Sequence, residues 1–369
     1  MDTILQAGLT LGMSSTAGFH MAKPKPPPKH LSGANVLPQE HCPTTRDRVP
    51  FPTYDKDRPV NASHLCIGAW PWGDRPTWHW SEDELGDVQA AWRKMYQAGI
   101  NFIDTAQTYG NGRSEEIVGR LISGLPRDSV VVQTKYFPNP LGIENYIHPI
   151  EAPVNALRQT LERIKVDYVD IYLVHGPIHP QSTTSIAQGM AECVTSGMAR
   201  AIGIANYDTQ GMLEFKESLE EYGVPLATHQ CEFSILRRWP ELHDEISTCH
   251  ANGVVFQGYS SIANGRLSGK YTTENPPPKT YRFSNYDMKD LEPTLDVLRA
   301  IARKRGKPVA SVSLNYSVSK GAVPVVGIRN VQQAEEAIEA MGWRLSSEEM
   351  KEIDDVSVEG QKTVLWQQG

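Results

Sequence analysis

Short runs of hydrophobic, often β-branched residues alternate along most of the chain with longer segments whose hydrophobic positions recur at helical spacing. Such runs without strict polar alternation are typical of strands that are buried on both faces of a parallel sheet. From His64 onward the pattern predicts eight strands, which we place at 65–69, 101–106, 130–135, 169–175, 199–206, 226–233, 253–260 and 323–328.

Amphipathic segments follow most of these strands and are predicted to be helices. At the start of the first one, Ser81 and Glu84 have the spacing of a capping box. The predicted helices cover about 81–97, 114–123, 154–164, 185–195, 209–222, 241–251, 290–305, 309–319, 331–341 and 346–353. Eight strand–helix units close naturally into a barrel, whereas a dinucleotide-binding sheet usually has about six strands. The sequence therefore predicts an α/β protein with a single (β/α)8 TIM barrel over residues 61–369.

The first 60 residues do not follow this pattern. Residues 1–21 carry one charged side chain, Asp2, and small polar residues interrupt the hydrophobic positions, so neither a signal peptide nor a membrane span is expected. The stretch KPKPPPK at 23–29 favours an extended, solvated chain. We predict a flexible N-terminal arm over residues 1–60. An organellar targeting segment is the alternative, although no arginine precedes Arg46.

Composition narrows the class of partner. The chain has 36 Lys and Arg against 43 Asp and Glu, so its surface as a whole offers no cationic field to nucleic acid or to an anionic membrane. The five cysteines include no CxxC pair, which is typical of a reducing compartment. We therefore expect a cytoplasmic protein, a monomer or weak homo-oligomer, whose partner is a small molecule.

A metal site is not expected from the sequence. His175 and His179 are four residues apart, but prolines in this segment prevent the helix that would align them. His243, Cys249 and His250 lie on or near a predicted helix without forming a closed set of ligands.

Polar residues stand where the predicted strands end. In barrels of this kind the carboxyl ends of the strands form the reactive face, so these side chains are expected to meet at one mouth. The strand-end residues are Asp104, Lys135, His175, Asn206, Gln230 and Tyr259. Tyr109 follows Asp104 by five residues on the next loop.

Four of these residues form a logical set for carbonyl reduction, which needs a hydride donor and a proton donor at the oxygen. Tyrosine ordinarily has a pKa of about 10, and a cation such as Lys135 beside Tyr109 would lower it by stabilising the phenolate. A buried ammonium in turn needs a carboxylate, which Asp104 could supply. His175 could donate a hydrogen bond to the substrate oxygen. Taken singly, each residue also has an ordinary structural role as a cap, a solvated charge or a packing residue.

Several motifs, in the expected order, resemble those of the aldo-keto reductase family. They are NFIDTAQTYG at 101–110, LVH at 173–175, GIANY at 203–207, GYS at 258–260, GRLSGKY at 265–271, and VGIR at 326–329 with Gln333 and Glu336. The resemblance covers about residues 65–355. It implies the (β/α)8 barrel, NADPH as cofactor, and a catalytic tetrad of Asp104, Tyr109, Lys135 and His175 with Tyr109 as the general acid.

The resemblance also implies the cofactor contacts. Asn206 and Gln230 would hold the nicotinamide carboxamide, and Tyr259 would stack on its ring. Arg329 would receive the 2′-phosphate through bidentate, charge-assisted hydrogen bonds. The remaining implied contacts are Ser260, Gly265 and Leu267 at the pyrophosphate, and Gln333 and Glu336 at the adenosine. The sequence departs from the family's common residues at Ala205, Ser261 and Ala337, which puts the affinity for the cofactor in doubt more than its identity.

Four tryptophans follow the first predicted strand, in WPWG at 70–73 and WHW at 78–80. At a strand's carboxyl end they could line an apolar aromatic pocket made by Trp70, Trp72, Trp78 and Trp80, or could simply cap the barrel. An aromatic or extended apolar carbonyl compound, such as those of specialised metabolism, is the predicted substrate. The WxWG stretch also resembles pyridoxal-reductase-like members of the family.

Two other functional classes stay open. The family's potassium-channel β subunits illustrate an NADPH-binding regulatory subunit that turns over slowly. A barrel lyase or isomerase would use Lys135 as a Schiff-base amine, which an ion pair with Asp104 disfavours. The leading expectation is NADPH-dependent reduction of an aldehyde or ketone to an alcohol.

Overall fold

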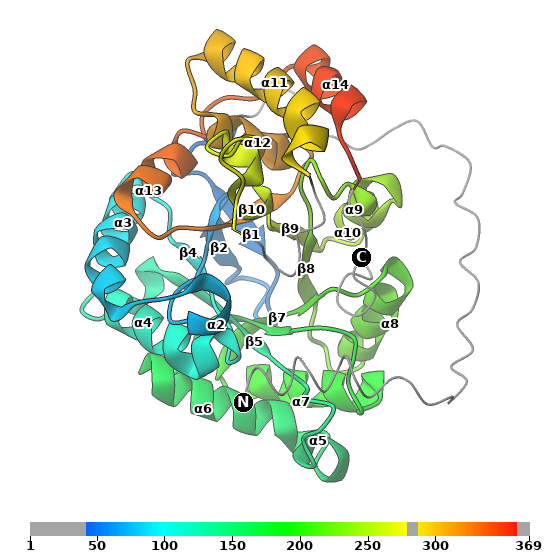
Figure 1. Ribbon diagram of the computed structural model, residues 1–369. Coiled ribbons are helices and arrows are strands. Elements are labelled where there is room, and N and C mark those ends of the chain that lie inside the picture. Colours follow the sequence, from blue (N-terminus) through cyan, green and yellow to red (C-terminus); the bar gives the residue numbers. More distant parts are fainter. Residues whose placement is uncertain (1–41, 279–286, 360–369) are drawn as a thin grey trace, which may run out of the picture.

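The computed structural model describes residues 42–278 and 287–359, and its parallel strands close into an eight-stranded barrel (Figure 1). The order around the ring is β10-β3-β4-β5-β6-β7-β8-β9. The barrel strands are β3 (Cys66–Gly68), β4 (Phe102–Asp104), β5 (Val131–Tyr136), β6 (Val169–Val174), β7 (Ala199–Ala205), β8 (Leu226–Glu232), β9 (Val255–Tyr259) and β10 (Val323–Gly327). Neighbouring strands follow chain order, as repeated βα units require. The predicted TIM barrel is confirmed.

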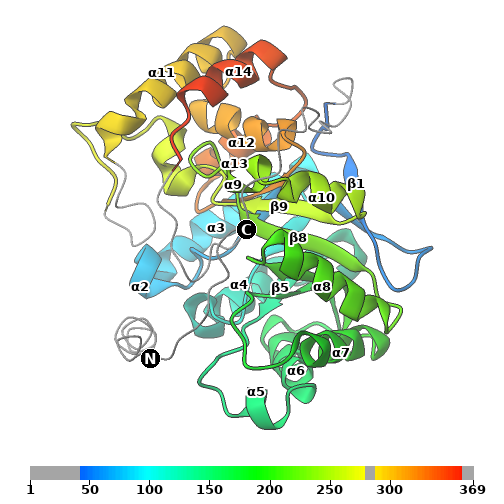
Figure 2. The same ribbon diagram turned by 90° about the vertical axis from the view of Figure 1, so that its right-hand side faces the viewer.

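Helices surround the barrel on its outer side (Figures 1 and 2). They are α2 (Arg75–Trp78), α3 (Leu85–Ala98), α4 (Arg113–Ile122), α5 (Glu144–Ile147), α6 (Glu151–Ile164), α7 (Thr183–Thr195), α8 (Thr209–Glu220), α9 (Trp239–Leu242), α10 (Glu245–Ala251), α11 (Met288–Arg305), α12 (Val309–Ser319), α13 (Val331–Ile338) and α14 (Ser347–Val356). Short 3₁₀ segments lie at Glu82–Glu84, Tyr109–Gly112, Arg127–Ser129 and Ala263–Ser268. The capping box predicted for Ser81 and Glu84 is present in front of α3.

A β-hairpin that the sequence pattern did not predict precedes the barrel. Its strands β1 (Arg48–Phe51) and β2 (Val60–Ser63) pair antiparallel. Phe51 meets Phe102 of β4 edge-on, with 5.6 Å between the ring centroids, and joins a buried hydrophobic cluster with residues that begin several barrel strands. The hairpin therefore covers the end of the barrel opposite the strand ends that carry the polar residues.

The predicted boundary at residue 61 falls inside this hairpin. Residues 42–60 of the predicted arm are thus part of the fold, because the hydrophobic side chains of β1 and β2 are buried against the barrel. Residues 1–41, which include the targeting segment considered above, lie outside the described residues. Across the described ranges, no helix combines the length and hydrophobicity needed to cross a bilayer.

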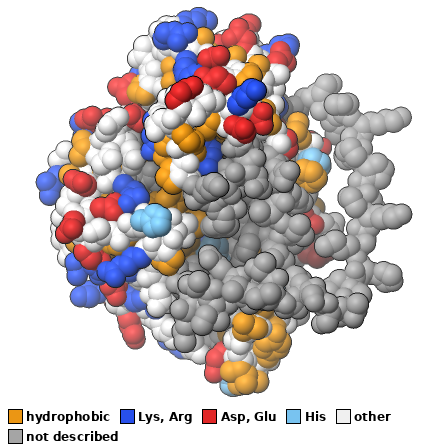
Figure 3. Space-filling view, in the orientation of Figure 1, with side chains coloured by type: hydrophobic (Ala, Val, Ile, Leu, Met, Phe, Trp, Pro, Cys, Tyr) orange, Lys and Arg blue, Asp and Glu red, His pale blue; other side chains and the backbone are white. Residues whose placement is uncertain are grey.

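Most element boundaries agree with the predicted ones to within a few residues. The segment predicted as one helix at 241–251 is two, α9 and α10, because Asp244 between them has a left-handed φ of 56° that interrupts the helical hydrogen bonds. Figure 3 shows hydrophobic side chains gathered at the lower edge of the molecule, over α5. The exposed residues of this segment are Leu141, Ile143, Tyr146 and Ile147.

Candidate active site

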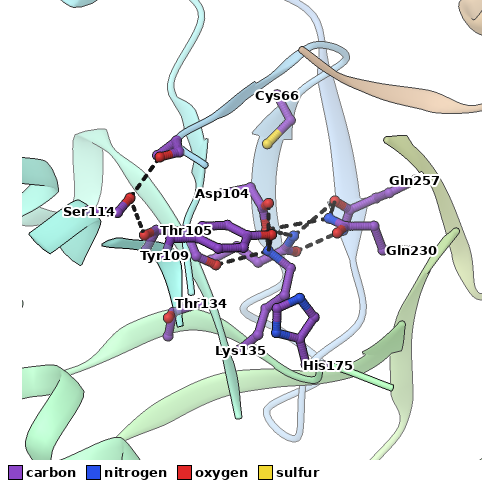
Figure 4. Close-up of polar contacts among 12 residues, drawn as sticks. Cys66, Asp104, Thr105, Tyr109, Ser114, Thr134, Lys135, His175, Gln230 and Gln257 are labelled. Carbon is purple, nitrogen blue, oxygen red and sulfur yellow. Dashed lines mark hydrogen bonds and ion pairs between the residues drawn. The ribbon is translucent and has the colours of Figure 1, made fainter. Parts of the chain in front are cut away.

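The carboxyl ends of β4 and β5 place an ion pair inside the mouth of the barrel. Asp104 ends β4 and Lys135 lies near the end of β5, and the two residues are 3% and 1% exposed. The Lys135 ammonium nitrogen lies 2.6 Å from each carboxylate oxygen of Asp104 and 2.9 Å from the Thr105 carbonyl oxygen (Figure 4). A buried pair of this kind requires such complete hydrogen bonding, because desolvation otherwise outweighs the attraction of the charges.

Tyr109 reaches this pair from the loop that follows β4. Its phenolic oxygen lies 3.2 Å from the Lys135 ammonium nitrogen. The loop turns sharply at Gly110, which has a φ of 55°, and a Cβ there would come within 2.5 Å of the Gly73 carbonyl oxygen. Glycine is therefore required at this position, and the turn aims the Tyr109 side chain back into the barrel.

His175 follows β6 directly and completes the set. Its backbone N–H donates to the Tyr136 carbonyl oxygen at 2.8 Å. The imidazole lies edge-on to the Tyr109 ring, with centroids 5.7 Å apart and 78° between the planes, and Phe137 packs on it at 6.2 Å. The structure thus brings together the four side chains of the expected tetrad (Figure 4). Their catalytic roles stay a prediction.

Burial controls the charge state of this site. It lowers the pKa of Lys135, while the neighbouring carboxylate of Asp104 acts in the opposite direction and favours the ammonium form. Burial and the Asp104 charge also raise the pKa of the Cys66 thiol, which therefore stays protonated. The Lys135 ammonium therefore faces the Tyr109 hydroxyl from beside the Asp104 carboxylate.

Three glutamines surround Asp104 inside the barrel, and two of them were not predicted. Gln133 donates to the carboxylate at 2.6 Å, and the Gln230 amide lies 3.3 Å from the same oxygen. The side-chain oxygen of Gln257 accepts from both amides at 3.0 and 3.1 Å, and its own amide donates to Gln133 at 2.7 Å. These bonds fix the orientation of the Asp104 carboxylate toward Lys135. The sequence did contain a signal for the two missed glutamines. Gln133 and Gln257 stand two positions before the last polar residues of β5 and β9, so period-two alternation puts them on the same inward face.

The residues expected to hold a nicotinamide lie on the adjacent strands β7, β8 and β9. Asn206 follows β7 with a φ of 65°, and its amide donates to the His175 carbonyl oxygen at 3.0 Å. The Asn206 side-chain oxygen accepts from the Tyr259 hydroxyl at 2.7 Å. Together with Gln230 these groups form a polar edge beside the buried ion pair.

The segment after β9 contains the residues expected at the pyrophosphate. Ser260 and Gly265 both have positive φ, 57° and 88°. A Cβ on Gly265 would lie 3.3 Å from the Tyr271 ring, so glycine allows that ring to pack closely on this backbone. Leu267 is fully buried, and its carbonyl oxygen accepts from the Ser313 hydroxyl of α12 at 2.7 Å. Leu267 therefore anchors the segment to the core.

Arg329 follows β10, and its guanidinium is bonded to the loop that precedes α3. Its Nε lies 2.8 Å from a Glu84 carboxylate oxygen, its Nη2 bonds the same oxygen, and its Nη1 donates to the Trp78 carbonyl oxygen at 3.1 Å. Gln333 accepts from the Arg329 backbone N–H at 2.7 Å, while Glu336 bonds a neighbour within α13. Sequence reasoning identified only the capping role of Glu84 and missed this ion pair.

The four tryptophans divide into two pairs. Trp70 stacks on Tyr109 with 6.0 Å between centroids, and meets Trp78 edge-on at 5.5 Å. Trp72 and Trp80 belong instead to the hydrophobic core, at 1% and 4% exposed. The Trp72 indole N–H donates to the backbone carbonyl just after β10 at 2.7 Å, so its burial leaves no unsatisfied donor. Trp70 and Trp78 therefore lie on the Tyr109 side, whereas Trp72 and Trp80 pack as capping residues would; that the four line a substrate pocket stays a prediction.

Comparisons with known proteins agree with this geometry. A profile of the Aldo/keto reductase family matches residues 64–358. The chloroplastic pyridoxal reductase of Arabidopsis thaliana is 31% identical over 321 residues, which are 83% of this chain and 86% of that protein. The structure of a glycerol dehydrogenase from Gluconobacter oxydans is 25% identical, has a TM-score of 0.72, and covers 86% of this chain and 98% of its own.

A solved aldo-keto reductase of Klebsiella pneumoniae in complex with NADPH shares the fold. It is 23% identical, has a TM-score of 0.66, and covers 86% of this chain and 98% of its own. The closed barrel, the motifs at its strand ends and a family profile that spans most of the sequence lead to one conclusion. This chain belongs to the aldo/keto reductase family of oxidoreductases.

Proposed function

We propose that the protein reduces an aldehyde or ketone to an alcohol with NADPH, and that Tyr109 gives its proton to the carbonyl oxygen. The observation that carries this proposal is the position of the Lys135 ammonium, 2.6 Å from both Asp104 oxygens and 3.2 Å from the Tyr109 hydroxyl. A cation held there stabilises the phenolate that remains when the proton leaves. The low dielectric of the buried site strengthens this effect.

Bound NADPH would supply the hydride that adds to the carbonyl carbon. As negative charge develops on the carbonyl oxygen, that oxygen takes the proton of the Tyr109 hydroxyl, and the phenolate faces the Lys135 ammonium. Asp104 holds the lysine in position and in its charged form. His175, which lies edge-on to the Tyr109 ring, would donate a hydrogen bond to the same oxygen. Solvent then returns a proton to Tyr109 after the alcohol leaves.

The residues around the mouth fit a nicotinamide dinucleotide. The side-chain amides of Asn206 and Gln230 offer the donor and the acceptor that a carboxamide requires. Gly265 supplies the positive φ of 88° that the loop expected at the pyrophosphate adopts. Arg329 carries the planar fork that suits a 2′-phosphate. To bind that phosphate, its guanidinium must exchange Glu84 for the ligand.

We further propose an aromatic or extended apolar carbonyl compound as substrate. The Trp70 indole stacks on Tyr109, so it lies beside the oxygen that donates the proton, and Trp78 extends this surface. Phe137 also meets the His175 ring edge-on. Aromatic faces at these positions favour a flat apolar group through offset and edge contacts. Pyridoxal, which names the relative that is 31% identical, is the first such compound to test.

The test combines purified protein, NADPH and a panel of carbonyl compounds that runs from pyridoxal and other aromatic aldehydes to short sugars. NADPH oxidation is expected with the aromatic members. Tyr109→Phe should retain NADPH binding and lose about 10²–10⁴-fold in kcat, the usual contribution of a general acid. Tyr146→Phe, at an exposed tyrosine on α5, is the matched control and should keep full activity. Full activity in Tyr109→Phe would reject the proton-donor role.

The Schiff-base alternative fits the structure less well. An amine must be free of its proton and accessible in order to attack a carbonyl. Lys135 is 1% exposed and contacts both oxygens of Asp104. Borohydride trapping of a substrate on Lys135 would favour a lyase or isomerase. The regulatory-subunit alternative predicts tight NADPH binding with negligible turnover across the whole panel.

The compartment and the assembly stay proposals. We expect a cytoplasmic monomer or weak homo-oligomer, and targeting by residues 1–41 is the alternative. Imaging a fluorescent fusion of the full chain beside one that lacks residues 1–41 tests the first point. Light scattering across a range of protein concentrations tests the second.

A further inference from the structure

β8 presents two metal-binding side-chain types on the face that points away from the barrel interior. Side chains alternate along a strand, so His229 and Cys231 point outward while Gln230 between them points toward Asp104. α10 covers this outer face. Its Glu245 and Cys249 are one helical turn apart, and both contact the β8 side chains.

The four side chains bring their polar atoms close together. Cys231 Sγ lies 3.0 Å from a Glu245 carboxylate oxygen and 3.1 Å from His229 Nε2. His229 Nδ1 lies 3.3 Å from the Glu245 oxygen and 3.8 Å from Cys249 Sγ. One ligand atom from each of His229, Cys231 and Glu245 lies within 4.8 Å of the other two. All four residues are at most 1% exposed, and none takes part in the proposed reaction.

These separations suit ligands that share one small cation. Zinc–sulfur bonds of about 2.3 Å and zinc–nitrogen or zinc–oxygen bonds of about 2.0–2.1 Å place tetrahedral ligand atoms roughly 3.3–3.8 Å apart. The observed contacts run from 3.0 to 3.8 Å, and they involve both ring nitrogens, because Nε2 meets Cys231 whereas Nδ1 meets Glu245 and Cys249. An imidazole binds one zinc ion through one nitrogen, so zinc held by Nδ1 would require the Cys231 thiol to rotate toward that nitrogen. Two thiols and an imidazole select zinc over magnesium or calcium, which prefer an all-oxygen set.

Zinc binding would change the protonation states of these ligands, because the raised pKa of each thiol opposes the thiolate form. Burial lowers the pKa of His229 to about 3, so its imidazole is neutral at physiological pH. The ring is also hydrogen-bonded to the Tyr207 backbone carbonyl, the kind of outer contact that orients a metal-binding imidazole. Burial raises the pKa of the Cys231 and Cys249 thiols. Zinc binding would convert both thiols to thiolates, with release of two protons to solvent.

We propose that His229, Cys231, Glu245 and Cys249 bind one structural zinc ion that joins α10 to β8. The site lies directly behind Gln230, whose amide is 3.3 Å from an Asp104 oxygen on the other face of the strand. The ion would therefore steady one wall of the candidate active site without touching the reacting groups. The proposal does not depend on the proposed reductase activity.

Sequence reasoning did not find this set, because only one of the residues it weighed takes part. Cys249 points toward β8, whereas the His243 ring stacks on Trp239 and His250 bonds the Gly321 carbonyl. The signal that could have found it is an H-x-C pair on one face of a predicted strand, followed by an E-x₃-C pair on one face of the next helix.

The test begins with the full-length protein produced in zinc-supplemented medium, whose zinc content is measured by elemental analysis. The proposal predicts one tightly held zinc ion per chain. Protein produced with cobalt in place of zinc should show the sulfur-to-cobalt charge-transfer absorption of thiolate ligands. A metal-free protein from the first preparation, together with no such absorption from the second, would overturn the proposal.

Substitutions of the proposed ligands test where the zinc ion binds. Cys231→Ala and Cys249→Ala should retain less than about a tenth of the wild-type zinc. Cys193→Ala, at a fully buried cysteine on α7, is the matched control and should retain all of it. Glu245→Gln keeps the side-chain volume and should lower zinc affinity by about 10–100-fold, which covers the case in which an alanine variant does not fold. Equal zinc in wild type, Cys231→Ala and Glu245→Gln would place the metal elsewhere and reject the site.

Discussion

The two ends of the barrel are built from the same strands and differ in almost every other respect. At the amino end, Phe102 and Val131 begin β4 and β5 and pack with Phe51 of the hairpin in a hydrophobic layer. At the carboxyl end, the same two strands carry Asp104 and Lys135. Close-packed hydrophobic side chains stabilise a fold, whereas a buried ion pair contributes little net stability after desolvation. One end therefore supplies stability, and the other is available for chemistry.

Disruption of the ion pair at the carboxyl end of the barrel has the largest expected effect. Lys135→Met leaves Asp104 buried without its cation, so the free energy of unfolding should fall by about 3–5 kcal/mol. Loss of the cation beside Tyr109 should lower kcat by about 10²–10⁴-fold. Urea unfolding and single-turnover NADPH oxidation measure the two effects.

A second substitution separates stability from chemistry at this end. Lys135→Met combined with Asp104→Asn removes both charges and should recover much of the lost stability but none of the activity. A catalytically competent Lys135→Met variant would show that the ion pair serves the fold alone.

A substitution in the hydrophobic layer at the amino end should lower stability without lowering activity. Phe51→Ala opens a cavity under the barrel and should lower the free energy of unfolding by about 3–5 kcal/mol. The kcat of the folded fraction should not change, because Phe51, Phe102 and Val131 lie at the end of the strands opposite Asp104 and Lys135. Tyr54→Ala, at an exposed residue of the same hairpin, should stay within about 0.5 kcal/mol of wild type. A lower kcat in folded Phe51→Ala would show that the two ends are coupled.

A smaller effect, on the KM for the cofactor, is expected from substitutions in the loops around the carboxyl end of the barrel. Arg329→Ala should raise the KM for NADPH by about 10–100-fold, because a charge-assisted hydrogen bond contributes roughly 1.5–3 kcal/mol, and should leave the KM for NADH nearly unchanged. Glu84→Gln should lower the KM for NADPH by a few-fold, since it weakens the competing ion pair while glutamine preserves the capping box. Equal changes for NADPH and NADH would exclude a phosphate contact.

Sequence reasoning predicted the barrel and the tetrad because both follow from local pattern. Alternation of strand and helix requires a parallel sheet, and Asp104, Lys135 and His175 lie at strand ends whatever the details of packing. The hairpin was missed because β1 is four residues long and contains Pro50, which strand patterns disfavour.

Contacts between residues that are far apart in the sequence were the other feature that could not be predicted. Period-two alternation shows that Gln133 points inward, but not that Gln257, 124 residues later, lies opposite it across the barrel. The pairing of Arg329 with Glu84 and the burial of Trp72 likewise depend on how loops fold over the barrel, which no local periodicity specifies.

The effect of pH sharpens the comparison because it acts on the carboxyl end alone. Burial lowers the pKa of Lys135 below its ordinary value of 10.5. As pH rises through the lowered pKa, the ammonium is lost and with it the stabilisation of the Tyr109 phenolate. The kcat/KM for reduction should then fall by about tenfold per pH unit. This decrease in kcat/KM should begin at a lower pH than the one at which an exposed lysine loses its proton.

The free energy of unfolding distinguishes loss of the Lys135 proton from alkaline denaturation. Between the lowered pKa and 10.5, the unfolded chain binds the Lys135 proton and the folded chain does not. The contribution of this lysine to the free energy of unfolding therefore rises with pH in that window, while activity falls. Urea unfolding of wild type and of Lys135→Met across the same window isolates this contribution as the difference between the two proteins. A kcat/KM that stays constant up to the ordinary lysine pKa would mean that the ammonium does not assist proton transfer.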